Sequence, residues 1–159
     1  HYPECFMAAL MTSDYDDTDR LAIEITECKK MGINVLPPDV NESFLEFAVV
    51  PGDRPSIRFG MNAIKNVGTG AVEEILRART ELGTFENLEQ FLGAVSPRVV
   101  NRKALESLIK AGAFDRFAPR QQLLANVDLL QAYAQRLQGL AGQRAAGHGA
   151  DGCTKTGAG

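Results

Sequence analysis

The chain has 159 residues, of which 45% are apolar and 23% are charged, and its net charge is −3. This size and composition suit one or two small globular domains with a buried core. The longest apolar runs, such as Phe6 to Met11, are far shorter than the roughly 20 residues that cross a bilayer, and no charged-then-apolar signal segment opens the chain. We therefore expect a soluble, cytoplasmic protein with no membrane partner, and the start at His1 suggests a piece of a longer polypeptide.

Few residues are available for metal binding or histidine chemistry. The three cysteines, Cys5, Cys28 and Cys153, are odd in number and share no CxxC spacing, which favours reduced thiols over a disulfide framework or a zinc site. The two histidines, His1 and His148, lie near the chain ends, so histidine acid/base catalysis and metal ligation are not expected.

The charge is divided unevenly along the chain. Residues 1–56 hold four basic and eleven acidic side chains, a net charge of −7, whereas residues 57–120 hold ten and seven, a net charge of +3. Residues 121–159 carry a net charge of +1. The middle segment therefore has the sign expected of a phosphate-binding surface, although its excess is mild.

Two short helices are predicted at the start of the chain. Pro3 resembles a helix opening, and apolar residues then recur at helical spacing until an acidic, turn-forming cluster at 13–17. A second helix is expected from about Asp19 to Met31, with Thr18 or Asp19 as its N-cap and one apolar stripe.

An extended region follows these helices. Residues 33–36 form a brief extended segment, and Pro37 and Pro38 then forbid helix and begin a turn. Segments 44–50 and 56–59 are rich in aromatic and β-branched residues and flank a turn with proline and glycine, which predicts a β-hairpin. We expect this hairpin to connect two helical parts.

The remainder is predicted to be all-α until the pattern is lost near Leu137. The expected helices cover residues 61–66, 70–80, 88–92, 99–111 and 120–137. Beyond them glycine and alanine dominate with no apolar face, which predicts disorder. The predicted fold is mainly α, with a helical unit at 1–43, a β-hairpin connector at 44–59, a helical module at 60–138 and a disordered tail at 139–159.

The segment MNAIKNVGTGAVEEILRAR carries the most specific local signal, a helix-hairpin-helix pattern whose turn is VGTG at 67–70. Its two glycines have no Cβ, so the backbone can adopt positive φ and approach another chain closely. The free amides that begin the second helix lie at the positive end of its dipole and suit a phosphate. Lys65 adds a positive charge, and Val67 is expected to pack with Ile64 and Ile75. Such a hairpin would hold a sugar-phosphate backbone without reading bases.

Plainer interpretations exist for this turn and for a weaker second copy at NRKALESLIKAGAFD. A GxG alone is more often a tight helix-helix turn, although the surrounding pattern favours the hairpin here. The second copy has one glycine, and a glycine C-cap closed by Phe114 explains it as well as backbone binding does. Arg102, Lys103 and Lys110 are expected near one surface in either case.

Four phrases resemble the bacterial DNA polymerase III alpha subunits, the family C replicative polymerases: HYPECFMAALMTSD, ECKKMGINVLPPDVNES, IRFGMNAIKNVGTGAVEEIL and NRKALESLIKAGAFD. The resemblance covers residues 1 to about 130. It implies that 1–43 is the C-terminal part of the fingers domain and that 60–138 is a tandem helix-hairpin-helix module that binds duplex DNA. The implied backbone-binding residues are Lys65, Val67, Gly68, Thr69, Gly70, Lys110, Ala111, Gly112 and Ala113, with Arg102 and Lys103 as supporting basic residues.

The resemblance also implies that catalysis lies elsewhere. In that family, palm aspartates bind magnesium for DNA-directed DNA synthesis, and this sequence begins after the palm. Asp14, Asp16, Asp17 and Asp19 are better explained as capping residues of a turn, so we assign no catalytic residue and no cofactor to the fragment. The implied partners are duplex DNA, the palm and fingers of the parent polymerase and, through the full-length protein, the sliding clamp and other replisome subunits.

Three functional hypotheses follow. The first is non-sequence-specific duplex binding as part of a replicative DNA polymerase, and the alternative is a helical protein-interaction scaffold with no DNA contact. Steep salt dependence and sensitivity to Gly68→Asp or Lys65→Glu would distinguish the first from the second. The third is a metal enzyme built on the aspartates at 14–19, for which a divalent ion would shift the melting temperature.

Overall fold

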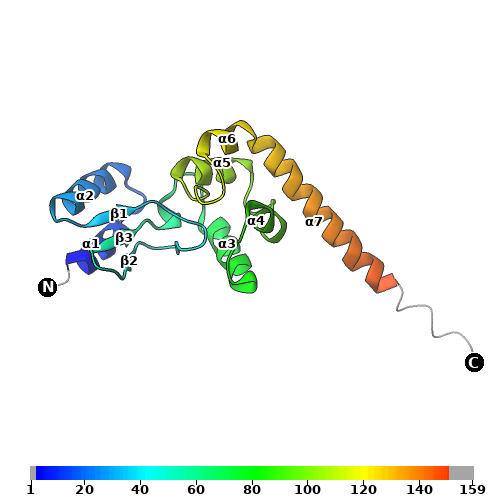
Figure 1. Cartoon of the computed structure of the whole chain (residues 1–159), viewed down its shortest axis with the longest axis horizontal. Coiled ribbons are helices and arrows are strands. Elements are labelled where there is room, and N and C mark those ends of the chain that lie inside the picture. The colour runs from blue at the N-terminus through cyan, green and yellow to red at the C-terminus, as the bar shows by residue number, and fades with distance from the viewer. Residues whose placement is uncertain (1–2, 151–159) are drawn as a thin grey trace, which may run out of the picture.

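The computed structural model describes residues 3–150, with side chains as far as Gly139, as a small α/β unit followed by a helical module (Figure 1). The predicted mainly α fold is confirmed. The elements in chain order are α1 (Pro3–Ser13), α2 (Thr18–Lys30), β1 (Asn34–Leu36), β2 (Ala48–Val50), β3 (Ser56–Arg58), the 3₁₀ turn η1 (Met61–Ala63), α3 (Thr69–Leu82), α4 (Leu88–Ala94), α5 (Arg102–Ala111), α6 (Arg120–Ala125) and α7 (Val127–Ala150).

The two N-terminal helices form as expected, with one difference at the cap. Asp17, one residue before the predicted Thr18 or Asp19, is the N-cap of α2, and its carboxylate accepts a hydrogen bond of 3.1 Å from the amide of Arg20. Thr18 and Asp19 are already helical. The cap satisfies one of the amides that lack a partner within the first turn.

The predicted hairpin is confirmed as β2 and β3, but it belongs to a three-stranded sheet. β3 is the central strand and also pairs in parallel with β1, so that Ile57 lies between Val35 and Val49. Ile57 is fully buried in one core with Met11, Leu21 and Cys28 from α1 and α2. The hairpin expected to be a connector is therefore part of the N-terminal core.

A second and larger core lies inside the helical module. Its centre is a chain of aromatic rings in which Phe91 makes edge-on contacts with Phe85 and Phe114, at centroid distances of 5.1 and 4.8 Å. Helices α3, α4, α5 and α7 contribute apolar side chains around these rings. Such edge-to-face pairs add to the free energy gained by burying the rings themselves.

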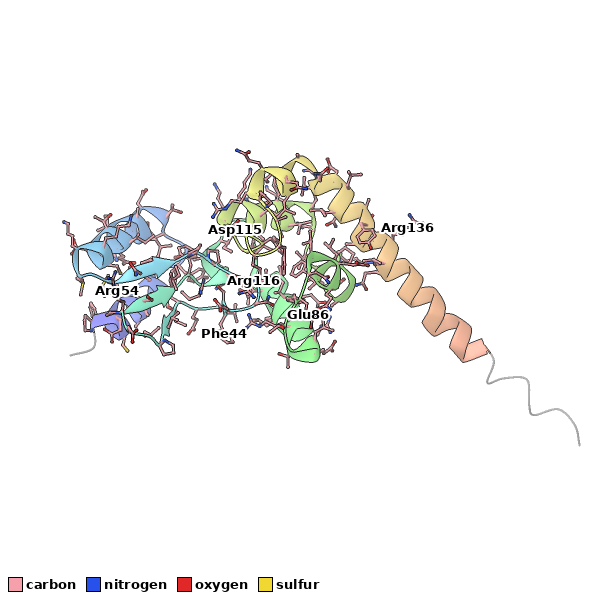
Figure 2. All side chains as sticks on the ribbon, in the orientation of Figure 1. Phe44, Arg54, Glu86, Asp115, Arg116 and Arg136 are labelled. Carbon is pink, nitrogen blue, oxygen red and sulfur yellow. The ribbon has the colours of Figure 1, made fainter. Side chains whose placement is uncertain are left out.

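The loop between β1 and β2 joins the two cores. Val40 is fully buried in the helical core, and its amide donates a hydrogen bond of 3.2 Å to the carbonyl of Ala113. Asn41 exchanges two hydrogen bonds with the backbone of Phe85, at 2.9 and 2.8 Å. Figure 2 shows Arg116 at this junction, where its Nε lies 3.1 Å from Oδ2 of Asp39. Residues placed in the predicted 1–43 unit thus pack on the helical module.

The largest differences from the expected helices lie in three places. Only Met61–Ala63 of the expected 61–66 helix is helical, as one 3₁₀ turn. The expected 120–137 helix breaks at Asn126 into α6 and α7. α7 continues to Ala150 through residues 139–150, where disorder was expected, and the rest of that predicted tail lies outside the described residues. Within residues 3–150, no helix is both long enough and apolar enough to span a membrane.

Candidate nucleic-acid interface

The VGTG turn between η1 and α3 is held from inside by apolar contacts. Val67 and Ile64 are buried, with exposed fractions of 5% and 8%, in the same core as Ile75. The amide of Val67 donates a hydrogen bond of 3.2 Å to the carbonyl of Ile64. The predicted packing of these three residues is confirmed. Val67 therefore anchors the turn from within, and its side chain is not an outward contact.

Helix α3 begins with amides that have no partner. Its N-cap is Gly68, which has no side chain to accept a hydrogen bond, and its first intrahelical bond runs from Val72 to Gly68 at 3.1 Å. Among the described residues, none accepts a hydrogen bond from the amides of Thr69, Gly70 or Ala71. The first turn holds no acidic residue. The positive end of this helix is thus open to an external anion.

The two glycines of the turn do not have the predicted conformation. Gly68 has φ of −78°, and Gly70 is not among the residues with positive φ; instead Asn66, just before the turn, has φ of +68°. Asparagine tolerates this left-handed conformation better than most residues with a Cβ. No role for Asn66 is predicted from the sequence, although an asparagine next to a glycine-containing turn was the available signal.

Neither glycine is required by the packing of the chain. A Cβ built on Gly68 or Gly70 meets no protein atom within 4 Å, and both residues are exposed. The absence of a side chain therefore leaves open surface above the amides of α3. A ligand could approach the backbone closely there.

The first hairpin touches α5. Nδ2 of Asn66 donates a weak hydrogen bond of 3.5 Å to Oγ of Ser107, in the middle of that helix. Next to it, Lys65 is exposed and has no acidic side chain within 4.0 Å among the described residues. Lys65 therefore offers an exposed charge directly before the turn in sequence.

The second predicted turn has the glycine C-cap geometry. Gly112 has φ of +95°, and its amide donates a hydrogen bond of 3.1 Å to the carbonyl of Ile109. The amide of Ala113 donates a hydrogen bond of 3.0 Å to the carbonyl of Leu108. Ala113 and Phe114 are buried in the helical core. Gly112 is also buried, and Ala111 is half-buried.

The basic residues of α5 divide into two groups. Arg102 pairs with Asp128 of α7 and lies 3.8 Å from Glu106, and Lys110 lies 3.0 Å from the same glutamate. The hydrogen bond from Lys110 lowers the pKa of Glu106 below its usual value. Lys103 is exposed and makes no ion pair among the described residues. Only Lys103 of the three is left without an internal counter-charge.

The aspartate-rich turn at 13–17 has structural roles. Asp17 caps α2, and Asp14 lies 3.6 Å from Arg20. Asp14 also adjoins Glu24, whose pKa burial raises to about 7. Within residues 3–150, no group of three or more His, Cys, Asp or Glu side chains is placed to hold a metal ion.

The chain belongs to the helix-hairpin-helix motif family, whose model matches residues 32–124. Among its relatives, it is similar to the DNA polymerase III subunit alpha of Campylobacter jejuni, with 44% identity over 86% of this chain and 12% of that protein. The same subunit of Thermus aquaticus is 46% identical over 84% of this chain, and that of Escherichia coli is 42% identical over 79%. The matches cover 11% of each of these two proteins, so the chain spans about a ninth of its relatives' length.

Proposed function

We propose that the first hairpin binds the sugar-phosphate backbone of duplex DNA without sequence specificity. The observation that carries the proposal is the open N-terminus of α3, where three amides without a partner among the described residues lie beneath a surface that Gly68 and Gly70 leave free of side chains. Partial positive charge on unpaired amides binds a phosphate oxygen whatever base the nucleotide carries. The match to the helix-hairpin-helix motif family supports this assignment.

Lys65, Thr69 and Gly70 are the residues that we place at the phosphate. Thr69 is exposed, and its hydroxyl donates a hydrogen bond of 3.1 Å to Oδ1 of Asn62, which leaves its oxygen in a defined position beside the open amides. Lys65 supplies a full positive charge. At the second turn the buried Gly112 and Ala113 offer little surface, so any contribution there would come from the exposed ammonium of Lys110.

We further propose that this DNA binding serves a DNA polymerase III alpha subunit in chromosomal replication. The similarity to several such subunits supports the proposal. On this view the parent polymerase transfers nucleotides with palm aspartates and magnesium outside this chain, and contacts with the sliding clamp and other replisome subunits belong to the full-length protein. A bacterial replication protein would act in the cytoplasm, and the fragment alone is expected to show no template-directed primer extension.

Fluorescence anisotropy with a labelled duplex of mixed sequence tests the binding. The dissociation constant of the whole chain should rise steeply between about 50 and 200 mM salt and should not depend on base sequence. Gly68→Asp places a carboxylate at the open amides, and Lys65→Glu reverses a charge, so both should weaken binding at least tenfold. Lys29→Glu, on the exposed surface of α2, is the matched charge control.

A protein-interaction scaffold predicts a different result. Its duplex affinity would be negligible, or equal in the three variants and the unaltered chain. Either outcome, with all proteins folded by circular dichroism, would overturn the proposed function.

A further inference from the structure

The hydrogen bond between Asn66 and Ser107 makes the hairpin and one face of α5 a single surface. Lys103, Ser107 and Lys110 are four and three residues apart, so their side chains leave the helix on the same side. Because Ser107 faces Asn66, this side of α5 borders the turn that carries the open amides. Arg102 and Glu106 lie on the adjoining row of α5, where Arg102 pairs with Asp128 of α7 and Glu106 pairs with Lys110.

Ser107 retains a free donor in this arrangement. Its Oγ accepts the hydrogen bond from Nδ2 of Asn66, and among the described residues its own hydroxyl hydrogen has no acceptor. A serine hydroxyl carries one donor in addition to its acceptor lone pairs. The hydroxyl can therefore donate to an external oxygen while Asn66 holds the side chain in place.

Asn66 makes this contact from a backbone conformation that is unfavourable for most residues with a Cβ. It is the one residue other than glycine with positive φ among the described residues, at +68°. A glycine would adopt that φ without steric penalty. Glycine, however, has no side chain to donate the hydrogen bond that Asn66 makes to Ser107 of α5. Backbone strain kept at a single polar residue is frequent at ligand-binding sites.

We propose that Lys103 and Ser107 of α5 form a second phosphate-binding site, which holds a neighbouring phosphate of the DNA strand bound at the open amides of α3. Asn66 is a positioning residue that orients Ser107. The inference rests on the proposed function of that hairpin. It distinguishes Lys103, which makes no ion pair within the part of the chain that the structure describes, from Arg102, whose charge is already paired with Asp128.

The number of ions released on binding tests this site directly. For the whole chain, the slope of log affinity against log salt is negative, and its magnitude should decrease by about one when a lysine that contacts a phosphate is removed. Lys103→Ala should therefore make the slope shallower by about one. Lys29→Ala removes the same charge from the exposed surface of α2 in the N-terminal unit, away from this face of α5, and should leave the slope unchanged (Figure 1).

Two further variants separate binding from folding. Ser107→Ala removes the donor without a change of charge, so affinity should fall severalfold while the slope stays the same. Asn66→Gly removes the steric penalty of the positive φ at this position, so the melting temperature should hold or rise while the affinity for duplex DNA falls. A merely structural role for Asn66 would instead lower stability and affinity together.

Two outcomes overturn the inference, and they differ in what else they overturn. If Gly68→Asp abolishes binding but Lys103→Ala leaves the slope of log affinity against log salt unchanged, the proposed α5 site is wrong and the proposed function of the hairpin is retained. If the unaltered chain shows no salt-dependent duplex binding at all, both the hairpin proposal and the α5 site fail.

Discussion

Nη1 of Arg79, on α3, lies 2.7 Å from the carbonyl oxygen of Ser43 in the loop that joins the two cores. The same nitrogen donates to the carbonyl of Val40 at 3.0 Å, and the guanidinium stacks on Phe44 at 4.7 Å from the ring centre. Arg79 is buried, with 8% of its surface exposed. Its side chain therefore ties the α/β unit to the helical module.

Arg79→Met should destabilise the chain markedly. The substitution keeps an apolar stem but leaves two buried carbonyl groups without donors, so we expect a loss of about 2–4 kcal/mol in the free energy of unfolding. Urea denaturation measures this. Arg77→Met on the exposed side of the same helix should cost less than about 1 kcal/mol. An equal loss in the free energy of unfolding for the two variants would contradict the role of Arg79 in joining the α/β unit to the helical module.

Glu24→Gln should change how stability depends on pH. Burial, together with the adjacent Asp14 carboxyl, raises the pKa of Glu24 to about 7. Between the unfolded pKa near 4.5 and the folded pKa, the folded state holds a proton that the unfolded chain has lost. The free energy of unfolding therefore falls as pH rises through this window and is constant above it.

Glutamine copies the protonated form at every pH. Glu24→Gln should raise the melting temperature by several degrees at pH 8, where each kcal/mol corresponds to roughly 2–4 °C, and should have little effect at pH 4.5. Thermal melts from pH 4 to 9 would show whether the two curves converge at the acidic end. A gain that is the same at every pH would exclude titration of Glu24 as the cause.

Gly112→Ala tests the C-cap of α5. The residue has φ of +95°, and an added Cβ would collide with the guanidinium of Arg120, which bonds Asp115 and the carbonyl of Lys110. We expect a loss of about 2 kcal/mol in the free energy of unfolding, against about 1 kcal/mol for Gly32→Ala, which has φ of +76° and open space around it.

The additional loss of stability in Gly112→Ala, relative to Gly32→Ala, should disappear when Arg120 is removed. In an Arg120→Ala background, Gly112→Ala should cost nearly the same as Gly32→Ala, because the remaining close atom is Oδ2 of Asp115, the end of a side chain that Arg120 no longer holds. If Gly112→Ala still costs more than Gly32→Ala in this background, the collision with Arg120 is not the cause of the difference.

Gly70→Ala should separate stability from DNA binding. Its φ is not positive and a Cβ there meets no protein atom, so the free energy of unfolding should hold or rise by up to about 1 kcal/mol. The methyl group nevertheless covers the open amides, so duplex affinity should fall. Gly93→Ala, inside α4, is the control: it should change the free energy of unfolding in the same way and leave the duplex affinity unaltered. Unaltered affinity in Gly70→Ala would place the DNA elsewhere.

Local patterns in the sequence were sufficient to predict most helices and the binding turn. The helical spacing around Leu21 and Leu108 and the apolar anchor at Val67 depend on neighbours within about four residues along the chain, and those neighbours are visible in the sequence. The hairpin of β2 and β3 was predictable for the same reason, since its strands are joined by a short turn. The helix break at Asn126 was missed, because no proline or glycine marks it.

Other features depend on groups far apart in the chain. The pairing of β1 with β3 and the docking of Val40 against Ala113 are decided by sheet register and by the shape of the helical core, which no local pattern encodes.

By itself, the sequence determined that this protein presents a glycine-containing turn at the start of a helix, with lysines nearby. The tertiary structure alone decided which charges are available, because an ion pair requires two side chains to meet in space. It placed Arg102 against Asp128 and left Lys65 and Lys103 without an internal partner among the described residues.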